Sequence, residues 1–260
     1  MGVVTLVSFD GFDLQNDTYK TIELDPMGSP DKSITMLPLA REDGSVLVHE
    51  NYNAKTITLT GSIKSDSKEN LELAIDALKK HLRRRSGNLQ YDWGGGVRIH
   101  KCVATKFGVD KSQGYISYTP IAISFQSESP FATDGITDTI IASQIITTAS
   151  NIYSFNVNGT MDSAPVITLQ INAINPDNVL REIVLANASL SKFLTIESIF
   201  KAGDIVVVDC TNYTIFKNGE YLFGKGQFPQ YDVGSGSLQY SDSATTRNIT
   251  ISATMERKYL

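Results

Sequence analysis

Apolar and polar residues alternate along most of the chain in short runs that turn residues separate. This pattern is typical of antiparallel β structure. In KTITLTGSI, residues 55–63, Ile57, Leu59 and Ile63 are expected on one side of a strand, opposite the threonines. The first half holds further strand patterns at 3–9, 19–24, 34–40 and 46–52, the last two around a turn at 41–45. Residues 98–107 and 115–126 predict a hairpin across 108–114.

One segment of the first half has helical periodicity instead, and it predicts an α-helix over about 67–85. Its apolar stripe repeats at spacings of three and four: Leu71, Ala74, Ile75, Leu78 and Leu82. Asp66 with Glu69 resembles a capping box, and Ser65 and Ser67 are competing caps. Acidic residues come first and basic residues last, which suits the helix dipole.

The basic run KKHLRRR, residues 79–85, admits two interpretations. It is either the solvated end of this helix or a nucleic-acid contact. The first is favoured because no aromatic residue interleaves with the charges for base stacking.

The second half predicts short strands and no helix. The strand patterns are 152–157, 165–174, 179–186, 193–196, 205–209, 213–217, 221–223, 237–240 and 246–255. Asn218-Gly219 is a type I′ hairpin signal. Regularly spaced strands of this kind predict an antiparallel sandwich. The expected organisation is a first domain over 1–133, a connector over 134–150 and a second domain over 151–260. An edge strand within the connector is left open.

Composition narrows the functional classes. The chain has 260 residues and a net charge of −5, and its first 133 residues carry 15 basic against 16 acidic side chains. A protein that coats nucleic acid is therefore disfavoured. The start of the chain shows no secretory signal pattern, and no apolar run suggests insertion into a membrane. Cys102 and Cys210 are expected as two free thiols.

The search for catalytic chemistry gives no catalytic, cofactor or metal residues. His100 and Cys102 share a strand face, but two ligands alone are a weak zinc signal. Trp93-Gly94-Gly95-Gly96 is better explained as a hairpin tip than as a phosphate loop. Asp204 and Asp209 do not define a glycosidase pair, and Asp204 is expected to bond its own turn.

Aromatic residues leave one binding function open, because an exposed ring can stack on a sugar. Trp93, the single Trp, falls in the first domain. Most of the second-domain aromatics are expected to pack between the sheets or at the edge of the sandwich: Tyr213, Phe216, Tyr221, Phe223, Phe228, Tyr231 and Tyr240.

The order of these segments resembles the distal tail protein (Dit) family of long-tailed, siphovirus-type bacteriophages. The resemblance rests on FDGFDL, AREDGSVLVHENYNAKTITLTGSI, the helix, GNLQYDWGGGVRI and YTPIAISFQSESPF. APVITLQI, KAGDIVVVDC and TIFKNGEYLFGKGQFPQYDVGSGSLQY extend it through the second half. It lies in many weak signals over residues 5–255.

The resemblance implies a mainly β fold: a barrel-like domain related to tail-tube proteins, with one packed helix, and then a galectin-like sandwich. It also implies a structural, non-enzymatic protein without cofactors that forms a homohexameric ring at the tail tip of the virion, after synthesis in the host cytoplasm. The ring would surround a channel through which DNA passes without specific binding.

The partners implied are the major tail tube protein and a tail-associated hub, lysin or fibre protein, with the tape-measure protein as a further candidate. The alternative function is a carbohydrate-binding adhesin module that contacts a host-surface glycan.

Overall fold

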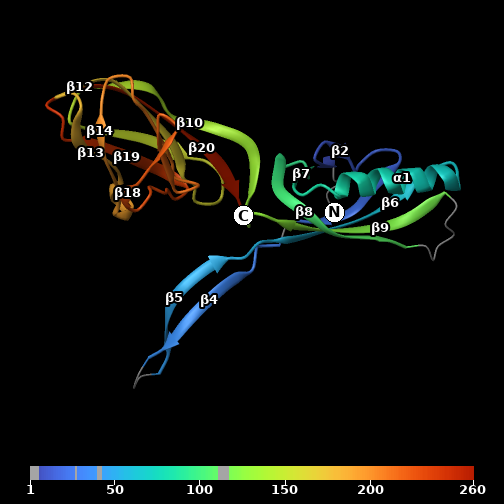
Figure 1. Cartoon of the computed structure of the whole chain (residues 1–260). Coiled ribbons are helices and arrows are strands. Elements are labelled where there is room, and N and C mark those ends of the chain that lie inside the picture. Colours follow the sequence, from blue (N-terminus) through green and yellow to red (C-terminus); the bar gives the residue numbers. More distant parts are fainter. Residues whose placement is uncertain (1–5, 27, 40–42, 111–116) are drawn as a thin grey trace. The chain divides into compact units, whose positions relative to one another are not determined.

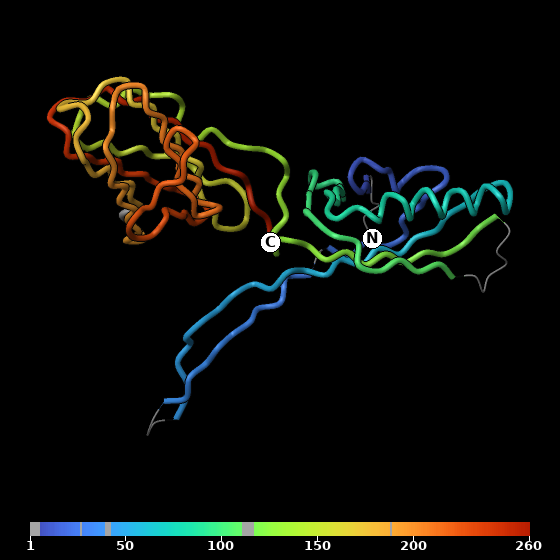
Figure 2. The backbone as a smooth tube through the Cα atoms, viewed as in Figure 1, coloured from blue at the N-terminus to red at the C-terminus, as the bar shows by residue number. Residues whose placement is uncertain are grey.

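The structure, a computed structural model, describes residues 6–26, 28–39, 43–110 and 117–260. The chain divides into two compact units, residues 1–134 with Leu260 and residues 135–259. Figure 1 shows the helix and strands of each unit, and Figure 2 traces the backbone through them.

The first unit is an antiparallel sheet with one helix packed on it. The helix α1 spans Lys68–Leu82. The strands are β1 (Leu6–Phe9), β2 (Phe12–Asp13), β3 (Tyr19–Asp25), β4 (Lys32–Pro38), β5 (Ser45–Tyr52), β6 (Thr56–Lys64), β7 (Gly87–Asp92), β8 (Val97–Val109) and β9 (Tyr118–Ser127). The main sheet runs in the order β3-β6-β9-β8-β7-β1-β2, and β4 and β5 form a separate pair. The long strand β8 joins both halves of this sheet, because its residues 97–102 pair with β7 and its residues 102–109 pair with β9, with a bulge between Ala104 and Lys106.

The core of this unit lies between α1 and the sheet. The helix contributes Leu71, Ile75, Leu78 and Leu82 from its predicted stripe, and all four are buried. Ile57, Leu59 and Ile63 of β6 are buried in the same cluster. The Tyr19 hydroxyl of β3 donates to the Ala74 carbonyl oxygen at 2.8 Å, which ties the helix to the sheet.

The helix start differs in detail from the capping-box expectation. Ser67 is the N-cap, and its Oγ accepts the Asn70 backbone N–H at 3.2 Å. Asp66 accepts instead from the Asn70 side chain at 2.7 Å. Part of the predicted first strand (3–5), of the turn at 41–45 and of the loop at 108–114 lies outside the described residues.

The second unit is an antiparallel β-sandwich. Its strands are β10 (Ala132–Ile146), β11 (Ser150–Val157), β12 (Pro165–Asn175), β13 (Val179–Asn187), β14 (Lys192–Phe200), β15 (Ile205–Asp209), β16 (Thr214–Lys217), β17 (Glu220–Leu222), β18 (Gly224–Gly226), β19 (Gly234–Asp242) and β20 (Thr246–Tyr259). One sheet has the order β17-β16-β15-β12-β20-β10, and the other β11-β19-β13-β14-β18.

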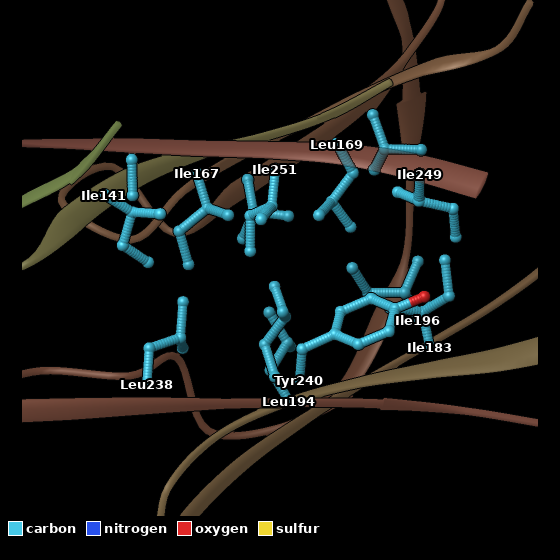
Figure 3. Packing of buried hydrophobic residues seen from close by; sticks show 14 of the residues in the cluster. Ile141, Ile167, Leu169, Ile183, Leu194, Ile196, Leu238, Tyr240, Ile249 and Ile251 are labelled. Atoms are coloured by element: carbon cyan, nitrogen blue, oxygen red, sulfur yellow. The ribbon is translucent and has the colours of Figure 1, made fainter. Parts of the chain in front are cut away.

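Apolar side chains from both sheets meet in a continuous core, as Figure 3 shows. Ile167 and Leu169 of β12 face Leu194 and Tyr240 of the opposite sheet. Alternation along strands such as β12 and β15 therefore places every second residue inside, as the sequence pattern predicts.

Two strands of this unit go beyond the strand patterns of the sequence. Most of residues 134–150, expected as a connector in which an edge strand is left open, belongs to β10, where Ile141 and Ile146 are buried in the sandwich core. The strand β18, Gly-Lys-Gly, has no apolar alternation to reveal it. In the described part of this unit the helical content is one 3-10 turn, Ala188–Leu190.

Candidate assembly and binding surfaces

The hairpin of β4 and β5, here called the arm, is the most exposed apolar feature of the first unit. Among the described residues its two strands pair with each other and with no other strand. Figure 1 shows it extending away from α1 and the main sheet. Seven apolar side chains are 40–58% exposed: Ile34, Met36, Leu37, Leu39, Val46, Leu47 and Val48.

Apolar residues occupy both sides of the arm, because Met36 and Leu37 are neighbours on one strand and Val46, Leu47 and Val48 on the other. An isolated two-stranded hairpin is marginally stable in water, and contiguous exposed apolar surface marks an interaction site. At its base, the Tyr52 ring lies 5.2 Å from Phe131. The arm is therefore anchored at one end and suited to a partner over the rest of its length.

The face of the main sheet opposite α1 is polar and rich in hydroxyl groups. Thr58 and Thr60 of β6 stand in register with Ser124 and Ala122 of β9. This face also carries a hollow of about 500 Å³. Apolar side chains such as Ile22 and Val109 line it, and Lys106 and Asp110 border it.

The basic end of α1 is partly neutralised within its own unit. Arg84 forms an ion pair with Asp10, and Lys79 pairs with Asp76 at 3.0 Å. The His81 ring packs against Phe12 with 4.4 Å between centroids. These contacts fit the interpretation as a helix end and give no support to a nucleic-acid patch.

His100 and Cys102 lie side by side in β8 and both are buried. The Cys102 Sγ donates to the His100 carbonyl oxygen at 3.3 Å. Burial and the charge of Lys55 lower the pKa of His100 to about 4, and burial raises the pKa of the Cys102 thiol to about 12. No group of three His, Cys, Asp or Glu side chains suited to a metal occurs in the ranges that the structure describes. The expectation that the chain holds no metal or catalytic site stays a prediction.

The structure confirms the role predicted for Asp204. Its Oδ2 accepts the Lys201 backbone N–H at 3.0 Å, and its Oδ1 accepts from the Asn218 side chain at 2.8 Å. Asp209 caps the next turn by accepting from the backbone N–H groups of Thr211 and Asn212. Both carboxylates thus stabilise turns. Gly94 and Gly96 likewise donate to Asp92 Oδ1 in a hairpin tip.

The second-unit aromatics separate into three groups. Tyr231 and Tyr240 are buried in the sandwich core. Phe216, Tyr221 and Phe223 form an exposed cluster at the edge strand β17, with 5.1 Å between the centroids of Tyr221 and Phe223. Tyr213 and Phe228 line a hollow together with Lys192 of a third segment. Strand alternation could not show this last grouping, since Tyr213 and Phe228 come from loops.

The helices of the described residues can be compared with the length that a membrane span needs. The helix α1 is short and amphipathic, and no helix in the described ranges is long and apolar enough to cross a bilayer.

Comparison with known proteins shows which class of protein this chain belongs to. Residues 24–126 match the phage tail protein RIFT-related domain, and residues 158–255 match the C-terminal domain of a siphovirus-type tail component. Together the two domain models cover most of the chain. No curated protein matches it by sequence.

Two solved structures are similar in fold. The crystal structure of the Dit protein of phage SPP1, described as a paradigm of the hub adsorption apparatus in phages that infect Gram-positive bacteria, is 18% identical. That match covers 99% of this chain and 100% of the SPP1 protein, with a TM-score of 0.67. A chain of the phage P2 baseplate, in its activated conformation with calcium, is 10% identical over 95% of this chain and 92% of its own length, with a TM-score of 0.46.

The fold and both domain matches define a structural component of a siphovirus-type phage tail. Within that class, the chain belongs to the distal tail protein (Dit) family. The predicted fold class, a barrel-like domain with one helix followed by a galectin-like sandwich, is confirmed.

Proposed function

We propose that this protein forms a homohexameric ring at the tail tip, between the tail tube and the hub and adsorption proteins, with a channel for DNA. It acts as a scaffold and not as an enzyme. Its partners are further copies of itself, the major tail tube protein and a tail-associated hub, lysin or fibre protein, with the tape-measure protein as an additional candidate. Membership of the Dit family supports a place for this protein in the phage tail. The exposed apolar arm supports its assembly into a ring.

The arm is the observation that carries the ring proposal. A ring needs a heterologous interface, in which one surface of each copy meets a different surface of the next. The arm offers a protruding apolar surface of this kind, and its exposed strand edges have backbone groups that a neighbouring sheet can pair. We assign the ring-forming role to residues 1–133, and a peripheral role to the sandwich of residues 151–260, with 134–150 joining them.

The channel wall is assigned to the hydroxyl-rich face of the main sheet. A strongly basic wall would hold DNA through its phosphates, because each neutralised phosphate releases counterions. Thr56, Thr58, Thr60 and Ser124 instead give a surface of hydroxyl groups, and the charge of Lys106 on this face is accompanied by that of Asp110. Such a wall allows a duplex to pass without binding it.

Leu37→Asp tests the ring proposal. Leu37 is 58% exposed on the arm, so the substitution leaves both cores untouched in the single copy. In a ring it would bury an unpaired carboxylate against apolar surface, which costs several kcal/mol at each interface. Light scattering should therefore show a fall in mass from about six copies to the 28.5 kDa single chain.

Leu180→Asp is the matched control, because Leu180 is 59% exposed on β13 of the sandwich. This variant should keep the mass of the unsubstituted protein. An arm variant that keeps that mass, or a control variant that loses it equally, would contradict the assignment of the ring interface to the arm.

A further inference from the structure

A shallow hollow of about 330 Å³ lies where three segments of the second unit meet. Lys192 begins β14, Tyr213 precedes β16, and the end of β18 with the residues after it supplies the rest. The lining is Lys192, Tyr213, Gly226, Gln227, Phe228 and Gln230. This volume is at the lower end of the range of roughly 300–1,000 Å³ that small-molecule sites occupy.

An aromatic ring is fixed at the edge of this hollow. Gln230 Nε2 donates to the Tyr213 hydroxyl oxygen at 2.9 Å, and Lys192 Nζ donates to Gln230 Oε1 at 2.7 Å. Phe228 supports the Tyr213 ring edge to face, with 5.6 Å between centroids. Tyr213 remains 56% exposed, so its ring is held in place and yet open to solvent.

The backbone beneath these side chains is also fixed. Tyr213 has a φ of 57°, in the left-handed region that a bulky residue rarely adopts. Asp209 holds the turn before it, and the buried Asn187 side chain donates to the Gln230 carbonyl oxygen at 2.7 Å. Strained backbone of this kind is concentrated at functional sites, and a pre-organised site loses less entropy on binding.

Lys192 is the charged side chain among the residues that line the hollow. Its ammonium group already donates to Gln230 Oε1, and its charge interacts with the carboxylate of Asp162. The chemistry offered is an exposed aromatic face beside amide and ammonium hydrogen-bonding groups.

We propose that this hollow is a saccharide-binding site that takes a neutral pyranose. The Tyr213 ring packs against the C–H face of the sugar, whose axial hydrogens suit the negative face of an aromatic ring. Gln227, Gln230 and Lys192 bond the sugar hydroxyls at the rim. A flat apolar face with hydroxyls around its edge matches this arrangement, whereas a peptide would need a longer groove or a free strand edge.

The proposal does not depend on the ring, since all of its residues belong to one sandwich. The test is a glycan array of neutral and acidic oligosaccharides, probed with the full-length protein, followed by calorimetric titration of the neutral glycan with the strongest signal. Tyr213→Asn removes the ring and suits the positive φ. Tyr221→Thr is the matched control, because Tyr221 is 54% exposed on β17 and outside the hollow.

We expect at least one neutral glycan to bind the unsubstituted protein and Tyr221→Thr equally, and Tyr213→Asn to lose about tenfold or more in affinity. Gln230→Ala should weaken binding by a smaller factor, which provides a second reading if the first variant folds poorly. The proposal is overturned by an array without neutral glycan binding, by binding of acidic glycans alone, or by Tyr213→Asn binding unchanged. It is equally overturned if Tyr221→Thr loses as much affinity as Tyr213→Asn. The mass of the assembly should be the same for all variants, so this test and that of the ring can fail separately.

Discussion

Truncation of Leu78 in α1 should strongly destabilise the first unit. The Leu78 side chain is fully buried between the helix and the main sheet. Leu78→Ala removes its methyl and methylene contacts and leaves a cavity, and such changes cost about 2.7–5.0 kcal/mol. Because Leu78 is enclosed between α1 and the main sheet, the surrounding side chains have little freedom to move into the cavity. We expect a loss of about 3–4 kcal/mol in the free energy of unfolding.

Leu73 supplies the control within the same helix, because it is 62% exposed. Leu73→Ala makes the same chemical change without removing core contacts, and alanine is at least as good a helix former as leucine. Its effect should stay within about 0.5 kcal/mol. The difference between the two variants therefore measures burial of the helix stripe alone.

The assay is urea unfolding followed by tryptophan fluorescence. Trp93, the single Trp of the chain, lies in the first unit and packs against its core, so its signal reports that unit. With a slope of about 2 kcal/mol per molar urea, the expected loss moves the midpoint down by about 1.5–2 M for Leu78→Ala. A shift equal to that of Leu73→Ala would refute the packing of α1 described above.

The remaining predictions concern buried polar and titratable groups. Cys102 and Cys210 are both buried, and burial raises the pKa of each thiol. A thiol reagent at pH 8 should therefore label no cysteine in the native protein and both cysteines in denaturant. Rapid labelling of the native protein would contradict this prediction. Burial alone would raise the pKa of Asp204, but bonds from Asn218 and the Lys201 N–H, with the charge of Lys217, bring it below its ordinary value. Its charged form therefore adds stability that is present above about pH 4 and is lost as pH falls further. Asp204→Asn should be destabilised relative to the unsubstituted protein at pH 7 and lose most of that deficit below pH 3, and a deficit independent of pH would argue against the charge.

Local periodicity explains which elements could be predicted. The 3.6-residue stripe of α1 and the alternation of Ile57 and Leu59 in β6 are both local patterns, and both are found as expected. Asn218 and Gly219 have the positive φ angles that a type I′ turn requires. In each case a few neighbouring residues determine the outcome.

What could not be predicted depends on distant partners. The strand β10 is stabilised by pairing with β20, more than a hundred residues later, and its Thr- and Ile-rich sequence has no clear alternation. The strands of the arm have the composition of buried strands, and their exposure follows from the lack of a pairing partner other than each other in the described structure. Adjacent apolar residues such as Val46 and Leu47 place apolar side chains on both sides of the hairpin. This pattern was the available indication in the sequence that the arm is exposed.

The hollow around Tyr213 could not be predicted from the sequence either, because its lining comes from distant parts of the chain. Lys192, Tyr213 and Gln230 are spread over 39 positions and three separate segments, and only the packing of the two sheets brings them together. Tyr213 was one of seven candidate aromatics, and its sequence context did not distinguish it from Tyr231, which is buried.

The most direct test of the ring is the mass of the purified protein by light scattering, with electron microscopy of the same fraction. Six copies of the 28.5 kDa chain give about 170 kDa, as a closed cyclic assembly requires. The account predicts this mass together with six-fold rings that have an open centre wide enough for duplex DNA. A single-chain mass without rings, both alone and when mixed with the tail tube protein, would contradict it.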